Sequence, residues 1–287
     1  MGRFTALTFA SLLAVGAAQA ARAADLLPPP PIEAPPLRGP VIDEPGGFYL
    51  RTDVGVGINA ASNLRSTYGD GSTEASLGAY EGPVGVGDSA LVGIGAGYQF
   101  NTWFRADVTG EYRSSANYTA KNYYQYTAPG SNCPTTGTAS CGDAYSAQLR
   151  SGLFLANGYL DLGTWAGITP YAGGGVGLYS YSVGTITDQS LSQVNGWGVG
   201  PSKQGGNFAW ALMAGLAFNL APNLKLDVGY RYVDMGTLST GTIVCTASCH
   251  YETQRFRLAS NDLRVGLRWT LDSRGAVYEP GPIRAKY

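Results

Sequence analysis

The chain has 287 residues, among them 41 Gly and 19 Tyr, and only 14% are charged, with a formal net charge of -1. A chain this close to neutral has no bulk electrostatic attraction for phosphate backbones, so nucleic acid is not expected as a partner. Beyond the N-terminal segment there is no run of about 18 apolar residues, so helical membrane spans are not expected either.

The N-terminus has the pattern of a secretory signal peptide. Arg3 precedes an apolar run from Phe4 to Ala18, and two small-residue cleavage sites follow this run. We expect residues 1–23 to be removed by cleavage after Ala23, with cleavage after Ala20 as the alternative. The mature protein then lies outside the cytoplasm.

Residues 24–46 form the next segment, which is rich in proline. Eight of the 16 prolines of the chain lie between Pro28 and Pro45. Proline lacks the backbone donor that a sheet needs and keeps the chain extended. The sequence therefore predicts a periplasmic arm that acts as a tether or spacer.

Eight segments downstream alternate apolar and polar residues with the period of two that is typical of strands. In the third of these, Arg105 and Asp107 share one face while Ala106 and Val108 share the other. The segments in chain order are 47–58, 90–100, 103–113, one within 145–162, 169–181, 208–220, 224–232 and 261–271. The upper half of the fourth is ambiguous, because Arg150 falls on the apolar phase unless a bulge intervenes.

The connections between these segments alternate in length. Tight turns are expected near Asn101–Thr102, Gly163–Gly167 and Ala221–Asn223, whereas the other four connections are long and polar. Short periplasmic turns and long extracellular loops are typical of outer-membrane barrels. The sequence therefore predicts an all-β fold, an eight-stranded antiparallel up-and-down transmembrane β-barrel over residues 47–271, followed by a periplasmic tail over 272–287.

Alternation alone does not decide which face of the barrel is apolar, since a soluble lipocalin-like barrel would point its apolar set inward. Aromatic residues gather at strand ends, as expected for interfacial girdles. They are Phe48, Tyr98, Phe100, Trp103, Phe104, Phe218 and Trp269 near one rim, and Trp210 near the other. Charges of opposite sign also alternate along single strands, as Arg105 with Asp107, which suits an interior of ion pairs. We therefore expect lipid outside.

The opposite face then carries the charges of the barrel interior. The residues assigned to it are Arg51, Asp53, Arg105, Asp107, Glu111, Arg113, Asp161, Lys225, Asp227, Arg231, Arg264 and Arg268. An eight-stranded barrel encloses little more than its own side chains, and buried charges there must be paired. This favours a packed polar plug, and a narrow diffusion channel is the alternative.

Several segments resemble the porin-like outer-membrane β-barrel family of alphaproteobacteria, which is related to the small OmpA-type barrels. The similar segments are Ala24–Leu26, Gly47–Leu50, Thr169–Gly177, Asp227–Tyr232 and Asn261–Trp269. The resemblance covers roughly residues 47–271. It implies the fold and an outer-membrane location, but its motifs are structural and do not specify an activity.

Four cysteines lie in the long connections, Cys133 with Cys141 and Cys245 with Cys249. In an oxidising compartment this spacing favours two local disulfides. The adjacent His250, the single histidine of the chain, leaves open a metal site with Cys245 and Cys249. It also leaves open a haem-binding loop that includes tyrosines 118, 123, 124 and 126.

The expected function is a non-enzymatic structural or surface role in the outer membrane of a Gram-negative bacterium, with no cofactor. His250 has no evident Ser partner for hydrolysis. The expected partners are outer-membrane lipid and lipopolysaccharide, the outer-membrane assembly machinery, and peptidoglycan or a host surface. A loop-borne ligand or haem binder is a further alternative.

The cysteine spacing yields a direct test. Peptide mass spectrometry of the mature protein without reductant should find Cys133 joined to Cys141 and Cys245 joined to Cys249, because each pair is close in sequence. Reduced samples provide the control. Free thiols in the mature protein would refute both pairings.

Overall fold

The computed structural model describes residues 46–68, 80–124, 141–191, 196–245 and 251–271. Within these ranges no helix has the length and hydropathy to cross a membrane. The regular elements are strands: β1 (Gly47–Tyr68), β2 (Tyr80–Val86), β3 (Ser89–Gln99), β4 (Phe104–Tyr124), β5 (Cys141–Asp161), β6 (Ile168–Val183), β7 (Ile186–Ser190), β8 (Trp197–Gly200), β9 (Lys203–Ala221), β10 (Leu224–Ser239), β11 (Val244–Cys245) and β12 (Glu252–Thr270). Apart from Gly46, the predicted signal peptide, arm and tail lie outside the described residues.

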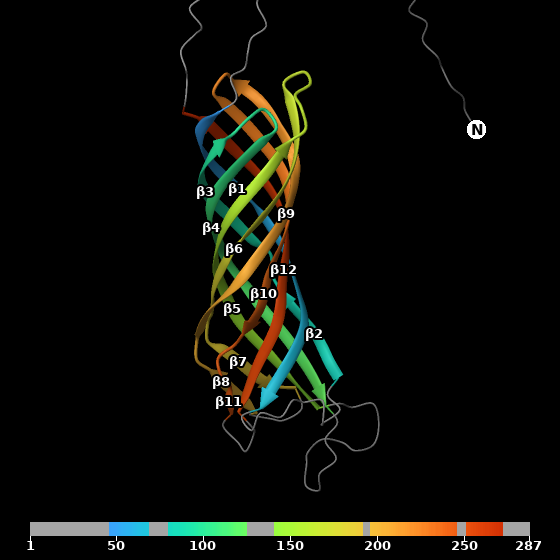
Figure 1. Ribbon diagram of the computed structural model, residues 1–287. Helices are drawn as coiled ribbons and strands as arrows, with labels where there is room; N and C mark the ends of the chain where they lie inside the picture. The colour runs from blue at the N-terminus through green and yellow to red at the C-terminus, as the bar shows by residue number, and fades with distance from the viewer. Residues whose placement is uncertain (1–45, 69–79, 125–140, 192–195, 246–250, 272–287) are drawn as a thin grey trace, which may run out of the picture. The chain divides into compact units, whose positions relative to one another are not determined.

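Eight of these strands close into a ring. The order around it is β1, β3, β4, β5, β6, β9, β10 and β12, each antiparallel to the next, and β12 pairs with β1 to complete the circle. Figure 1 shows the ring as a long cylinder of steeply tilted strands. The prediction of an eight-stranded antiparallel up-and-down barrel is confirmed.

The two ends of the cylinder differ in their connections. Short turns join β3 to β4, β5 to β6 and β9 to β10 at one end, here called the short-turn end. The long connections leave from the opposite, long-loop end. Part of what the sequence assigned to loops is strand there, since β2 continues along β4 beyond β3, and β7 continues along β5 beyond β6. The predicted strand limits were too short for this reason.

The outer face of the short-turn half is apolar. Phe48, Val54 and Ile58 on β1 are all exposed, at 62, 55 and 48%. From Phe48 to Ile58 the strand advances about 33 Å, or about 25 Å along the axis at the usual tilt, which matches a bilayer's apolar core. This belt of exposed apolar side chains is called the apolar band below.

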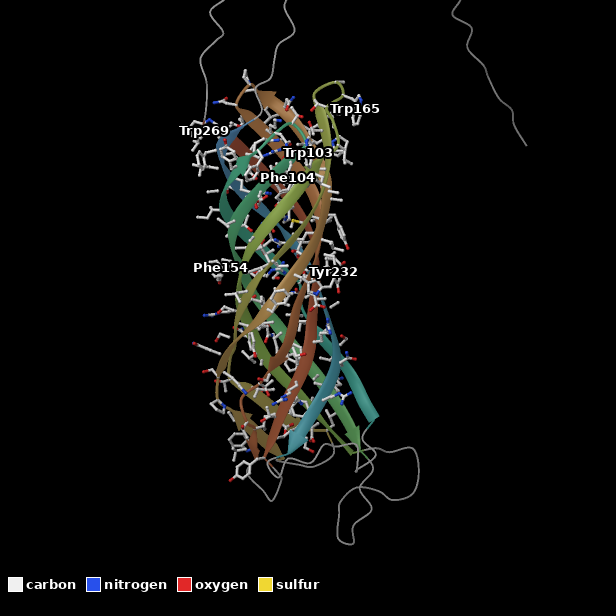
Figure 2. The ribbon with its side chains drawn as sticks, in the orientation of Figure 1. Trp103, Phe104, Phe154, Trp165, Tyr232 and Trp269 are labelled. Carbon is white, nitrogen blue, oxygen red and sulfur yellow. The ribbon has the colours of Figure 1, made fainter. Side chains whose placement is uncertain are left out.

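Aromatic side chains border the apolar band on both sides. Figure 2 shows Trp103, Trp165 and Trp269 near the short-turn end of the cylinder, and Phe154 and Tyr232 at about mid-height. The second border is thus far from the long-loop end. The band covers only about half of the cylinder, and the rest of the wall projects beyond it.

Beyond the band the alternation reverses, so that apolar residues point inward and polar residues outward. In three strands one extra residue produces this reversal, because a bulge shifts the phase of every residue that follows it. The bulges lie between Ser62 and Arg65 in β1, between Arg113 and Ala116 in β4, and between Asp234 and Thr237 in β10.

The fourth predicted strand reverses in a different way. The register of β5 with β6 runs without interruption from Leu149 to Asp161, and Arg150 is exposed while its neighbour Leu149 is buried. Arg150 therefore faces outward with no bulge in β5. The residue types change at this point of the strand while the phase of the backbone does not.

The interior is accordingly divided into two zones. In the short-turn half it is filled by charged residues and tyrosines. In the long-loop half most of it is an apolar core that includes Tyr118, Met235, Leu238, Ile243 and Phe256, each 0% exposed. A few polar side chains are buried there too: Asp188, Glu252 and Gln254. The second zone has the polarity of a water-soluble barrel, with the apolar residues inside.

Two adjacent glycines of β6 test how tightly the interior is filled. A Cβ on inward-facing Gly173 would lie 2.6 Å from Tyr159 Cδ1 and 2.7 Å from the Gly158 carbonyl, whereas a Cβ on outward-facing Gly174 would meet nothing closer than 3.6 Å. Gly173→Val should lower the free energy of unfolding in urea by about 1–3 kcal/mol, because overpacking displaces neighbours. The control Gly174→Val should be neutral or stabilising. Equal effects of the two substitutions would contradict this packing.

Candidate functional site

The charged residues of the short-turn half form the candidate site. Of the twelve interior charges that the sequence predicts, eleven are buried, and Lys225, at the short-turn rim, is partly exposed. The structure adds one residue, Asp262, which is 0% exposed. The buried set then contains six arginines (51, 105, 113, 231, 264, 268) and six carboxylates (53, 107, 111, 161, 227, 262).

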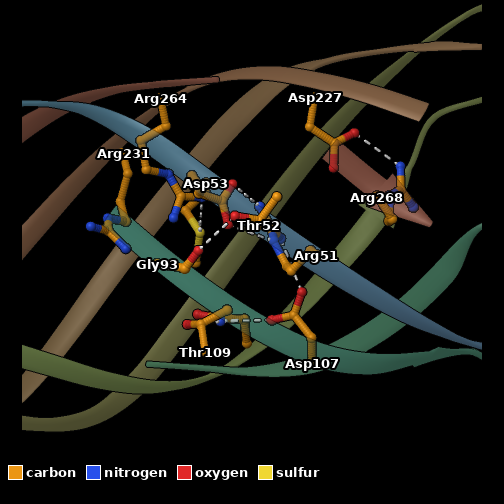
Figure 3. Close-up of polar contacts among 12 residues, drawn as sticks. Arg51, Thr52, Asp53, Gly93, Asp107, Thr109, Asp227, Arg231, Arg264 and Arg268 are labelled. Atoms are coloured by element: carbon orange, nitrogen blue, oxygen red, sulfur yellow. Dashed lines mark hydrogen bonds and ion pairs between the residues drawn. The ribbon is translucent and has the colours of Figure 1, made fainter. Parts of the chain in front are cut away.

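The first cluster is centred on Arg51. Its guanidinium forms ion pairs with Asp53 at 2.7 Å and with Asp107 at 3.0 Å, and donates to the Tyr159 hydroxyl at 2.9 Å. The Asn157 amide donates to the other Asp107 oxygen at 2.7 Å. Figure 3 shows Asp107 of β4 reaching toward Arg51 of β1, next to Asp53. The donors therefore use both oxygens of Asp107.

The second cluster lies closer to the middle of the cylinder and has four charged members. Arg231 forms ion pairs with Glu111 at 2.7 Å and with Asp262 at 2.6 Å. Arg113 forms ion pairs with the same two carboxylates. The Ser260 hydroxyl donates to Asp262 at 2.6 Å. Residues from β4, β10 and β12 are thus cross-linked through two arginines and two carboxylates, which balance in charge.

The third set lies toward the short-turn end. Arg105 pairs with Asp161 at 3.1 Å, and its guanidinium carbon lies 4.0 Å from the ring centre of Tyr159 and 4.9 Å from that of Tyr171. The two terminal nitrogens of Arg105 have no hydrogen-bond partner, so the aromatic faces supply the compensating attraction. Arg268 pairs with Asp227 at 3.1 Å.

This arrangement pairs the interior charges with one another. Within the described residues, no group of three or more His, Cys, Asp or Glu side chains is placed to hold a metal ion. Five of the six arginines form ion pairs with carboxylates, and Arg264 donates to the Met213 sulfur at 3.8 Å. A charge left unpaired in such an interior is costly, and these partners provide the compensation.

The sequence contained the signal for the residue that the prediction omitted. Asp262 lies in the same period-two phase as Arg264 and Arg268, so the alternation that selects these arginines also selects Asp262. Tyr159 likewise shares its phase with Asp161. What the sequence could not provide is the pairing across the barrel, which depends on the register of distant strands.

Tyr118 does not belong to the haem-binding loop that the sequence left open. This residue lies in β4 inside the barrel, where its ring stacks on Phe256 at 4.6 Å and its hydroxyl donates to Gln254 at 2.7 Å. It is therefore not part of an accessible loop. His250 and Tyr126 lie outside the described residues.

The predicted disulfides remain predictions. Cys141 begins β5 and Cys245 ends β11, so each lies at the edge of a long connection. Their expected partners, Cys133 and Cys249, lie outside the described residues.

A groove of about 710 Å³ lies on the outer wall of the cylinder, near the edge of the apolar band that faces the long-loop end. It lies where Gly110 and Gly152 carry no side chain, and its lining includes Ile94 and Phe154, which are exposed at 69 and 59%. These walls suit the acyl chains of a surrounding bilayer.

Comparisons with known proteins agree with this architecture. The model of the family described as outer membrane protein beta-barrel domain matches residues 7–251. An uncharacterized protein of Brucella abortus is 31% identical over 223 residues, covering 75% of each chain, and the outer membrane protein PagN of Salmonella typhimurium is 28% identical over 126 residues, covering 42% of this chain and 50% of PagN.

Among solved structures, Neisserial surface protein A covers 78% of this chain and 97% of its own, at 19% identity and a TM-score of 0.40. The family match confirms the resemblance seen in the sequence motifs and the expected outer-membrane location. The match extends over most of the sequence. The chain therefore belongs to the outer membrane protein β-barrel domain family.

Proposed function

We propose that the protein is a rigid, closed, non-enzymatic barrel of the outer membrane that raises its extracellular loops above the bilayer. The observation that carries this proposal is the balanced set of six arginines and six carboxylates buried in the interior. A barrel filled in this way supports a structural role.

The projecting half of the cylinder supports a role at the cell surface. β1 continues for ten residues beyond Ile58, which corresponds to about 25 Å above the apolar band at the usual tilt. The apolar core of this half, around Tyr118 and Phe256, stabilises it outside the membrane. The long connections are thereby carried away from the lipid surface.

The names of similar proteins support a role at the cell surface. Besides PagN, a candidate adhesin of Rickettsia prowazekii is 26% identical over 115 residues, covering 40% of this chain. We propose that the loops contact a host or environmental surface, that lipopolysaccharide surrounds the barrel, and that the outer-membrane assembly machinery inserts it. We propose peptidoglycan as a contact of the N-terminal arm.

The ion-pair clusters predict a large effect of a small substitution. Asp262→Asn leaves Arg113 and Arg231 with one full carboxylate between them, so the free energy of unfolding in urea should fall by about 3–5 kcal/mol. The same Asp→Asn change at exposed Asp88, in the turn between β2 and β3, is the matched control and should have little effect. A neutral Asp262→Asn variant would show that the network does not stabilise the barrel.

A filled interior also predicts the electrical behaviour of the protein. Purified wild-type barrels in planar lipid bilayers should give no stable single-channel steps, because paired charges and tyrosines occupy the interior. A large porin in the same bilayers provides the positive control. Reproducible conductance steps from the wild type would support the narrow-channel alternative and overturn the closed barrel.

A further inference from the structure

The outer wall above the apolar band has an unbalanced charge. Among strand residues whose side chains the structure describes, every exposed charged one is basic: Arg65, Lys121, Arg150, Lys203, Arg255 and Arg257. Of the carboxylates described in this half, Asp188, Asp234 and Glu252 are buried and Asp143 is partly exposed. The wall outside the extracellular lipid boundary is therefore positive.

Three of these arginines lie together on β1 and β12. Arg65 and Arg255 are directly opposite each other in the antiparallel register, and Arg257 is the next outward position of β12, opposite Ser62. This group is called the arginine shelf. On β10, Ser239 and Thr237 are in register with Arg255 and Arg257, so hydroxyl groups flank the shelf.

The shelf is electrostatically unsatisfied. Like charges directly opposite each other on neighbouring strands destabilise a sheet. Arg257 pairs with Asp234 at 2.7 Å, but in the described part of the chain neither Arg65 nor Arg255 forms an ion pair. An anion between these guanidiniums would turn the repulsion into attraction.

The sequence builds this shelf through the bulge in β1. Asn63 has a φ of 52°, a conformation that Asn tolerates better than most residues. The extra residue shifts the phase, so Leu64 turns inward, where it is 3% exposed, and Arg65 turns outward. Without the bulge Arg65 would face the interior and the pair with Arg255 would not form.

The shelf begins at the height of lipid headgroups with Arg257 and extends outward to Arg65 and Arg255. Asp234 of β10 is in register with Ala259 on one side and with Trp210 on the other. Trp210 packs against Tyr232 at the aromatic border nearer the long-loop end, with ring centres 5.5 Å apart. Arg257 is the next outward position beyond Ala259, so the shelf begins just above that border.

We propose that the arginine shelf binds the phosphate groups of an outer-leaflet lipid, with the lipid A part of lipopolysaccharide as its ligand. Arginine presents a planar fork of donors that matches phosphate, and two or three such forks suit a phosphorylated headgroup. The acyl chains of the same lipid lie against the apolar band below. This inference rests on the membrane orientation and is independent of whether the barrel conducts.

The test uses the full mature chain, folded in detergent micelles, and native mass spectrometry with two probes: lipid A carrying its phosphates and the same lipid with its phosphates removed. Wild type should retain phosphorylated lipid A and lose the phosphate-free form. Arg65→Gln with Arg255→Gln should weaken retention by about 30-fold, because two basic side chains at a lipid surface are lost. Arg65→Lys with Arg255→Lys should keep most of the binding.

Lys203→Gln is the matched control, since it removes an exposed positive charge from β9, away from the shelf, and should leave retention unchanged. Heat-modifiable gel migration verifies that every variant is folded. Equal retention of the two lipids, or full retention by the double Gln variant, would overturn the proposal. So would displacement by millimolar inorganic phosphate alone.

Discussion

The closure of the sheet between β1 and β12 is the constraint on which the rest of the molecule depends. In lipid, every backbone donor and acceptor of a strand must be satisfied by a neighbouring strand, because no water is available. Eight strands meet this requirement only as a ring, and a ring of eight encloses space for side chains alone. Polar residues on the inner face therefore have to satisfy one another, as Arg231 and Asp262 do.

The same closed wall faces lipid in one half and water in the other. In the short-turn half it separates lipid from a charged interior, and in the long-loop half it separates water from an apolar core. The backbone hydrogen bonds continue across the boundary, while bulges in β1, β4 and β10 change which residues face outward. One cylinder thus joins a membrane protein to the equivalent of a water-soluble barrel.

The sequence predicted the short-turn half well, because alternation within each single strand determines which side chains face lipid there. Alternation in Trp103–Arg113 alone separates lipid-facing Val108 from buried Asp107. The long-loop half was harder to predict, because bulges and a change of residue type reverse which side chains face outward. A bulge at Asn63 has no strong signature, and the exposed Arg150 looked out of phase only because both halves were assumed to face the same solvent.

The candidate site shows a similar limit. Ten of the twelve charges recognised from the sequence form ion pairs in the interior, and Arg264 instead donates to the Met213 sulfur at 3.8 Å. Which arginine meets which carboxylate was not predictable, because Arg113 and Asp262 are distant in sequence and meet only when β4 and β12 curve toward each other. Periodicity predicts which side chains face the interior, whereas the register of distant strands decides which of them pair.

The apolar core of the long-loop half has a consequence for transport across the envelope. A solute descending from the loops would first meet packed Phe256 and Leu238 and then the ion pairs around Arg51. The first layer disfavours ions because most of its side chains are apolar, and the second disfavours apolar molecules because displacing paired charges is costly. The closed barrel that we propose thus places two barriers of opposite polarity in series.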